Sequence, residues 1–109
     1  MATEQRTIEF LAEQVAGAGE IRYRKMFGEY ALYCDEKVVA LVCDDQLFVK
    51  ITPVGRTYLD ESHDGLPYPG AKPWIRVPED YWDDDEWMAR LIRETAAALP
   101  VPKPKRHKS

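Results

Sequence analysis

Thiol and imidazole side chains are the first candidates for nucleophilic chemistry in this chain of 109 residues. The sequence holds two cysteines, Cys34 and Cys43, and two histidines, His63 and His107. A catalytic cysteine needs a base within hydrogen-bond reach and a lowered pKa. His107 lies in the C-terminal tail and His63 in a polar stretch, whereas both cysteines end apolar runs. The pattern favours small apolar residues at strand ends, and two cysteines alone predict neither a disulfide framework nor a zinc site.

Carboxylates are the second group that could do chemistry. They cluster at Asp44-Asp45, at Glu79-Asp80 and in the run from Asp83 to Glu86. None of these clusters has the alternating ligand spacing, closed by a glutamate, that calcium loops use. Turn chemistry accounts for the first cluster, and helix capping with the helix dipole accounts for the last. Since the glycines also stand singly rather than in a phosphate-binding motif, we predict no catalytic residue, no metal site and no cofactor.

A meander of strands is the predicted framework of the domain. Three apolar runs are separated by the dipeptides Asp35-Glu36 and Asp44-Asp45, a spacing typical of tight β-hairpins. The runs are Glu29–Cys34, Lys37–Cys43 and Gln46–Ile51. Neither dipeptide is the preferred Asn-Gly, so the turn type stays open. Before them, the alternation of the segment 21–27 is broken at Met26 and Phe27, which predicts a bulge or bend ahead of Gly28.

Two-residue turns would fix which strand residues face each other. Tyr33 would then face Val38 and Ala31 would face Ala40, which assigns the two faces of the sheet. The better core face carries Ala31, Tyr33, Val38, Ala40, Val42, Leu47, Val49 and Ile51. The second face carries an apolar middle formed by Tyr30, Leu32, Val39, Leu41 and Phe48. If helices cover only the first face, this second face is a candidate protein interface, and a symmetric homodimer is the simplest partner.

Helical patterns flank the meander in sequence. The first begins near Thr7, with Thr3 or Thr7 as the expected cap, and ends at Gly17 and Gly19. Its apolar face is Ile8, Leu11, Ala12 and Val15. The second spans 78–100, with acids at its N-terminal end and Pro100 as its stop. Its apolar face is Met88, Leu91, Ile92, Thr95 and Leu99. A short helix, a proline-rich loop and the strand 74–77 lie between. The order predicts an α+β fold of two layers, with an antiparallel β-meander sheet and the N-terminal and C-terminal helices packed on one face.

The charge of the chain is divided between an acidic body and a basic tail. The net charge is −4, but residues 1–100 carry 11 basic and 19 acidic side chains. We assign 1–100 to one domain and 101–109 to a disordered tail rich in proline and lysine. The tail cations are Lys103, Lys105, Arg106 and Lys108. Together with Arg22, Arg24 and Lys25 they are candidate nucleic-acid contacts. The alternatives are a charged strand edge and a solubilising terminus.

The proline-rich loop "LPYPGAKPW" presents two aromatic residues, Tyr68 and Trp74. Exposed aromatics in a stiff loop can form a protein-binding surface. Folding back over the edge of the core is the alternative. No apolar run approaches the length of a membrane span, and the first ten residues lack the pattern of a signal peptide. These observations favour a cytoplasmic protein without membrane partners.

The segments "RKMFGEYALYCDEK", "YPGAKPW" and "VPEDYWDDDEWMARLIRETAAAL" resemble the N-terminal domain family of TfoX, a competence regulator also called Sxy. The resemblance covers roughly residues 5–99. The residues that match the family motif are Arg24, Lys25, Met26, Phe27, Gly28, Tyr30, Leu32 and Tyr33. Glu29 and Ala31 stand where the family usually has glycine.

The resemblance implies an α+β fold with an antiparallel sheet and no established catalytic residues. Full-length members act as co-activators of DNA-uptake genes together with the cyclic AMP receptor protein, and they carry a second domain. This chain has a lysine-rich tail in that place. The predicted function is therefore a non-enzymatic, cytoplasmic module of transcription-related regulation that acts through protein contacts. The alternative is a direct nucleic-acid binder that uses Arg22, Arg24, Lys25 and the tail.

Overall fold

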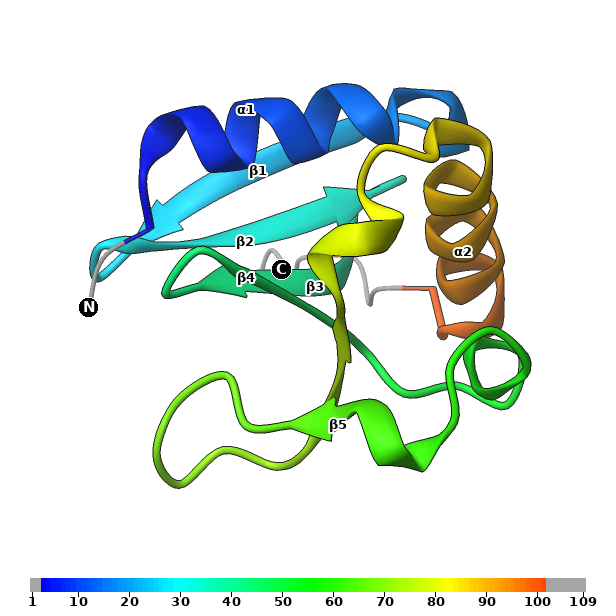
Figure 1. The fold of residues 1–109 in the computed structure, drawn as a ribbon. Coiled ribbons are helices and arrows are strands. Elements are labelled where there is room, and N and C mark those ends of the chain that lie inside the picture. The colour runs from blue at the N-terminus through cyan, green and yellow to red at the C-terminus, as the bar shows by residue number, and fades with distance from the viewer. Residues whose placement is uncertain (1–2, 102–109) are drawn as a thin grey trace, which may run out of the picture.

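The computed structural model describes residues 3–101, and two helices and six strands account for most of this part of the chain (Figure 1). The elements are α1 (Gln5–Gln14), β1 (Ile21–Met26), β2 (Glu29–Cys34), β3 (Lys37–Cys43), β4 (Gln46–Val49), β5 (Asp64–Gly65), β6 (Trp74–Val77) and α2 (Asp85–Ala98). Short 3-10 turns lie at Ala16–Ala18, Gly55–Thr57, Glu61–His63 and Glu79–Tyr81. Neither α-helix in the described range has the length and apolarity needed to cross a bilayer.

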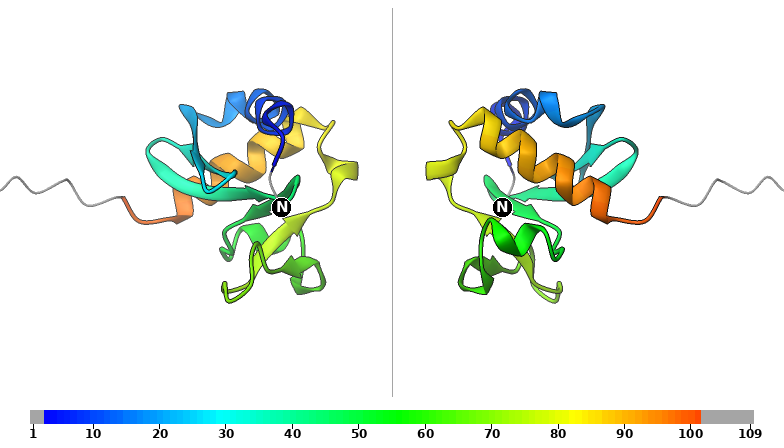
Figure 2. Two further views of the ribbon diagram at one scale, coloured as in Figure 1. Left: turned by 90° about the vertical axis from the view of Figure 1, so that its left-hand side faces the viewer. Right: turned by 90° about the vertical axis from the view of Figure 1, so that its right-hand side faces the viewer.

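The strands form one antiparallel sheet in the order β1-β2-β3-β4-β6-β5. Both helices lie on the same side of this sheet, whereas the loop between β5 and β6 lies away from α1 (Figure 2). The predicted two-layer α+β fold is therefore confirmed. Two strands were not in the predicted order of elements. The basic segment 21–26 is a full strand at one edge, and β5 adds two residues at the other edge.

Three two-residue turns connect the first four strands. Phe27-Gly28, Asp35-Glu36 and Asp44-Asp45 all have positive φ at both central residues, between 52° and 81°. Two left-handed residues in succession are the signature of type I′ turns, whose twist matches that of the flanking strands. Only Gly28 is a residue that adopts this conformation without cost. The bend predicted before Gly28 is thus a tight hairpin.

A β-bulge overturns the predicted assignment of residues to sheet faces. Tyr33 pairs with Val38 as expected, but the register shifts before the next pair, and Leu32 rather than Ala31 lies opposite Ala40. Val39 is the additional residue on β3. The prediction assumed an unbroken ladder. A one-residue shift moves the side chains of β2 that lie beyond the bulge, from Tyr30 to Leu32, to the opposite face from the one predicted.

The sheet therefore has an inner face, which packs on the helices, and an outer face. Tyr30, Leu32 and Val39 are buried in the main core, together with Ala40 and the apolar faces of both helices. Leu41 and Phe48 alternate with core residues along β3 and β4, so they point to the outer face. The five residues predicted as one interface are divided between the two faces, and that part of the prediction was wrong.

The helix termini are held by residues of the sheet. Neither Thr3 nor Thr7 caps α1, in contrast to the prediction. Instead the carboxylate of Asp45, in the β3–β4 turn, accepts hydrogen bonds from the Glu4 amide at 3.0 Å and the Thr7 hydroxyl at 2.9 Å. At the end of α2, Lys37 donates from Nζ to two carbonyl oxygens, of Ala96 and Leu99. Each charge has the sign that the helix dipole favours.

Candidate functional site

The tip of the β1–β2 hairpin exposes apolar side chains to solvent. Phe27 is the first residue of the turn, with φ 52°, and its side chain is fully exposed. Met26, the last residue of β1, is 41% exposed. A bulky aromatic residue gains nothing from burial here and rarely adopts positive φ. The stability of the domain therefore does not account for a phenylalanine at this position.

An apolar groove of about 550 Å³ lies between this hairpin tip and the loop that follows β5. Met26 and Phe27 come from the hairpin, Pro67 and Tyr68 come from the loop, and Leu41 comes from the middle strands of the sheet. The remaining lining residues are Glu29, Tyr30 and Cys43. The volume lies within the range of pockets that hold small ligands or anchoring side chains.

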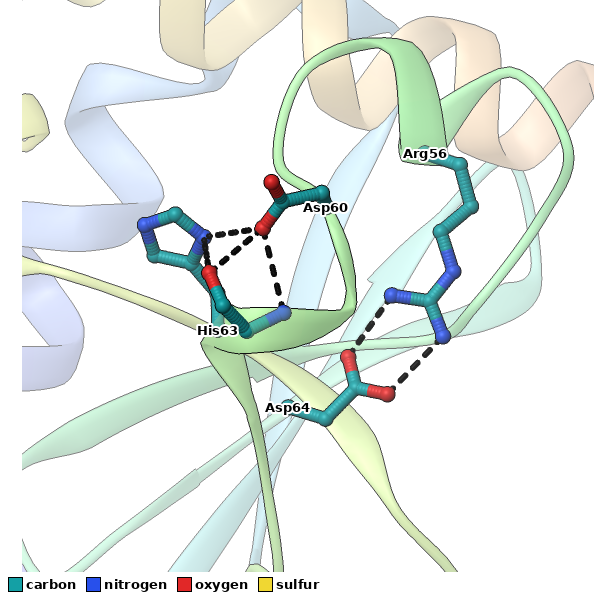
Figure 3. Close-up of polar contacts among 5 residues, drawn as sticks. Arg56, Asp60, His63 and Asp64 are labelled. Carbon is teal, nitrogen blue, oxygen red and sulfur yellow. Dashed lines mark hydrogen bonds and ion pairs between the residues drawn. The ribbon is translucent and has the colours of Figure 1, made fainter.

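The loop is held in place at its beginning. Arg56 and Asp64 form a bidentate ion pair with two N···O distances of 2.8 Å, which joins the 3-10 turn at 55–57 to β5 (Figure 3). This guanidinium lowers the pKa of the Asp64 carboxyl. Next to it, Gly65 packs on Phe48 so closely that an added Cβ would lie 3.3 Å from Cε1 of the ring. Pro67 is buried, whereas Tyr68 is exposed beside the groove.

A row of directly paired residues crosses the outer face beside the groove. Antiparallel partners share a face, so the successive pairs place five side chains in line. The row is Arg24, Ala31, Leu41, Phe48 and Arg76, from β1 to β6. Its middle is apolar, and an exposed arginine stands at each end. Arg22 belongs to the same face, and its guanidinium carbon lies 5.9 Å from the centroid of the Tyr33 ring.

The outer face has an excess of positive charge. Within residues 3–101, Arg22, Arg24 and Arg76 take part in no ion pair. The carboxylate nearest the groove, that of Glu29, already accepts hydrogen bonds from the Thr3 hydroxyl at 2.6 Å and the Asp44 amide at 3.0 Å. The many acids of α1 and α2 belong to the helix layer. An otherwise acidic domain thus presents a basic and apolar sheet face.

The three predicted nucleic-acid contacts that lie within the described residues do not share one face of the sheet. Arg22 and Arg24 lie on the outer face, whereas Lys25 pairs with Tyr30 and belongs to the inner face. β1 is an edge strand, the setting of the alternative interpretation in which charge guards the edge. Four further predicted contacts fall outside the described residues, namely Lys103, Lys105, Arg106 and Lys108.

Neither cysteine has the surroundings of a nucleophile. Cys34 belongs to the inner face and Cys43 to the outer face, and both are buried. Burial raises the pKa of both thiols, and the acids Glu29 and Asp44 add to the effect on Cys43, whose pKa reaches about 11. These thiols stay protonated at neutral pH, so they pack as small apolar groups.

A cluster of Asp60, Ser62 and His63 has the residue types of a hydrolase triad but not its geometry (Figure 3). Asp60 accepts hydrogen bonds from the Ser62 hydroxyl at 2.5 Å and the Ser62 amide at 3.1 Å. The Nδ1 atom of His63 faces both the carboxylate, at 3.4 Å, and the hydroxyl, at 3.5 Å. A triad needs one ring nitrogen for the acid and the other for the nucleophile. Asp60 therefore serves as the cap of a 3-10 turn, and its hydrogen bonds to Ser62 lower its pKa.

Two acidic clusters serve the structural roles that the sequence indicated, since Asp44-Asp45 forms a turn and Asp84 caps α2. Asp45 caps α1, and the Asp84 carboxylate accepts a hydrogen bond from the Trp87 amide at the start of α2. Asp85 and Glu86 follow in the first turn of the same helix, where its dipole favours them. Within the described range, no three His, Cys, Asp or Glu side chains come together as metal ligands would.

These features define a class: a small two-layer α+β domain with helices on one sheet face and an apolar groove on the other. The family model of the TfoX N-terminal domain matches residues 13–99, and the chain belongs to this family, as its resemblance indicated. The uncharacterized 12.7 kDa protein in the trpE 5′ region of Spirochaeta aurantia is 42% identical over 115 residues. That alignment covers all of this chain and 94% of the relative. The family is not one of enzymes.

Sequence reasoning found only part of this surface. Leu41 was in the predicted interface, and Tyr68 was one of the two candidate loop aromatics. The groove itself was missed, because the adjacent Met26 and Phe27 were interpreted as a break in a pattern. A glycine preceded by an aromatic residue between two alternating segments was the available signal for an exposed hairpin tip.

Proposed function

We propose that this protein is a non-enzymatic regulatory module that binds a protein partner through the groove on its outer sheet face. The observation that carries the proposal is the fully exposed side chain of Phe27 in a left-handed turn, beside a groove with an apolar lining. Apolar anchors gathered around a groove are characteristic of protein interfaces, where a few such residues supply most of the binding energy.

Family membership supports a role in transcription-related regulation in the cytoplasm. Full-length relatives of the TfoX type work as co-activators, a function that requires protein contacts rather than catalysis. A second copy of the chain is one conceivable partner, but pairing along the β1 edge is opposed by like charges. An antiparallel pair of two β1 strands would bring together Arg22, Arg24 and Lys25 of both copies.

Site-specific crosslinking tests this proposal. Phe27 is replaced by the photoreactive amino acid p-benzoylphenylalanine, and the protein is irradiated in cells of its natural host. Phe10 is the matched control, because it is a partly exposed phenylalanine on α1, in the other layer. The proposal expects discrete protein adducts from position 27 and few from position 10. Equal yields from the two positions would contradict it.

Direct nucleic-acid binding is the second candidate function. It is favoured by Arg22, Arg24 and Arg76, which lie on one face and form no ion pair among residues 3–101. Its test is fluorescence anisotropy of labelled duplex DNA with the full chain and with residues 1–100, at low and moderate salt. Binding that falls steeply with salt or on truncation supports this candidate, because phosphate contacts release counterions. Absence of binding by both proteins at low salt rules it out.

A further inference from the structure

We infer that the partner segment bound by the outer face is acidic and carries one large apolar side chain as its anchor. This inference rests on the proposed function and specifies its ligand. The apolar side chain enters the groove over Leu41, and carboxylates of the same segment reach the arginines of the outer row. An acidic protein segment with a leucine or an aromatic residue at its centre has this chemistry.

The groove selects an uncharged anchor. Leu41 and Cys43 line it from β3, and Pro67 and the Tyr68 side chain face them from the loop. The Cys43 thiol is neutral at physiological pH, because its pKa is about 11. Although Glu29 lines the groove, its carboxylate is held by Thr3 and by the Asp44 amide. A charged group placed here would lose water without gaining a partner, whereas an apolar group gains from burial.

The arginines of the row stand on both sides of this anchor position. Arg24 and Arg76 are each two strands away from Leu41, which corresponds to about 10 Å in either direction. A guanidinium binds a carboxylate in a bidentate manner. Both arginines are available for such a contact, because neither has an ion-pair partner among residues 3–101. In an extended segment that runs from the anchor across β2 toward Arg24, about three residues separate the anchor from the carboxylate. A segment that reaches Arg76 passes over Gly65, which covers Phe48.

The surface suits an acidic protein segment better than a nucleic acid. Binding of single strands relies on exposed aromatic rings on which bases stack. Along the outer row the Phe48 ring is 4% exposed and lies beneath Gly65, and the Tyr33 ring already has the Arg22 guanidinium over it. The exposed rings of Phe27 and Tyr68 line the groove instead. A net charge of −8 on residues 1–100, from 11 basic and 19 acidic side chains, also repels a long polyanion. A short acidic segment needs only the local arginines.

Peptide titrations followed by ¹⁵N–¹H correlation spectra test the inference on the full chain. The probe is a short peptide of aspartate and glutamate with Leu-Phe at its centre. Two controls replace the acids by asparagine and glutamine, or replace Leu-Phe by Ala-Ala.

The acidic Leu-Phe peptide is expected to shift the amides of Met26, Leu41 and Tyr68. Arg24→Glu weakens its binding about tenfold or more, and Arg90→Glu leaves the binding unchanged. Arg90 is the matched control because it is an exposed arginine on α2.

Each outcome separates the inference from the proposed function. If the neutral Leu-Phe peptide binds as tightly as the acidic one and Leu41→Asp abolishes both, the groove binds proteins but the acidic ligand is wrong. If no peptide shifts the groove amides, both the inference and the proposed function are wrong.

Other ligands give two further outcomes. If oligothymidylate binds, Arg24→Glu abolishes that binding and no peptide binds, the face recognises nucleic acid and the inference is wrong. Concentration-dependent dimerisation that Leu41→Asp abolishes assigns the groove to a second copy. Thermal melting of each variant, together with the milder Leu41→Ala, shows that lost binding is not lost folding.

Discussion

Two neighbouring rows of side chains cross the same five strands of this domain, and they have different roles. The inner row consists of Lys25, Tyr30, Val42, Leu47 and Val77, and its last four members are at most 4% exposed in the core. The outer row, one residue along each strand, has an apolar middle with an arginine at each end. The comparison shows that one set of strands supplies both the stability of the domain and its candidate binding surface, through alternation alone.

Leu32 and Leu41 distinguish the two faces most strongly. Leu32 is fully buried among core residues, whereas Leu41 is only partly buried beside the groove. Leu32→Ala should cost about 2–5 kcal/mol of unfolding free energy, because it leaves a cavity in the core. Leu41→Ala should cost about 1 kcal/mol or less. Urea denaturation measures both values, and equal losses would break the distinction between the faces.

The raised pKa of Cys43 predicts how the free energy of unfolding changes at alkaline pH. Its pKa is raised in the folded state, so the unfolded chain releases the thiol proton first as the pH rises. Stability is therefore complete below the ordinary pKa of 9.0 and is lost as the pH approaches 11, by an amount on the order of 2 kcal/mol. Cys43→Ala should lose less stability than the parent protein between these pH values. Denaturation midpoints at pH 8 and at pH 10.5 make the comparison, and parallel losses in the two proteins would contradict it.

Lys37 and Lys50 form a matched pair, because both line the same shallow pocket beside Leu99 at the end of α2. Lys37 donates to the carbonyl oxygens of Ala96 and Leu99 at 2.7 and 3.1 Å, which satisfies the last turn of α2. Lys50 makes no such side-chain contact within residues 3–101. Lys37→Met should lower the free energy of unfolding by about 1 kcal/mol, and Lys50→Met should leave it nearly unchanged, as urea denaturation can measure. A loss from Lys50→Met as large as that from Lys37→Met would show that the helix cap is unimportant.

The arginines at the ends of the outer row should contribute least to folding. Neither Arg24 nor Arg76 has an ion-pair partner in the described part of the chain. The double variant Arg24→Gln with Arg76→Gln should therefore change the unfolding free energy by less than about 0.5 kcal/mol, as surface substitutions usually do. Calorimetric melting checks this value. A larger loss would mean that the two arginines support the sheet rather than a binding function.

The success of sequence-based reasoning differed between the two faces for a physical reason. The bounds of β2 and β3 and the positions of their turns were readable, because two polar residues between apolar runs are a local signal. β4 ends at Val49 rather than at the predicted Ile51. The bulge at Val39 was not readable, since no glycine marks it. That single residue decides whether Leu32 or Ala31 enters the core. The groove depends on contact between a hairpin and a loop about 40 residues later in sequence, which no local pattern records.

Because Asp45 caps α1, the first helix depends on a residue that is synthesised later. The Glu4 amide and the Thr7 hydroxyl donate to a carboxylate 41 and 38 residues downstream. An isolated helix of this length, ten residues, is marginal in water. During translation the segment therefore leaves the ribosome before the Asp45 carboxylate that holds its first turn has been synthesised. A nascent chain that stops short of residue 45 lacks both hydrogen bonds, so the stability of the N-terminal layer is linked to that of the meander.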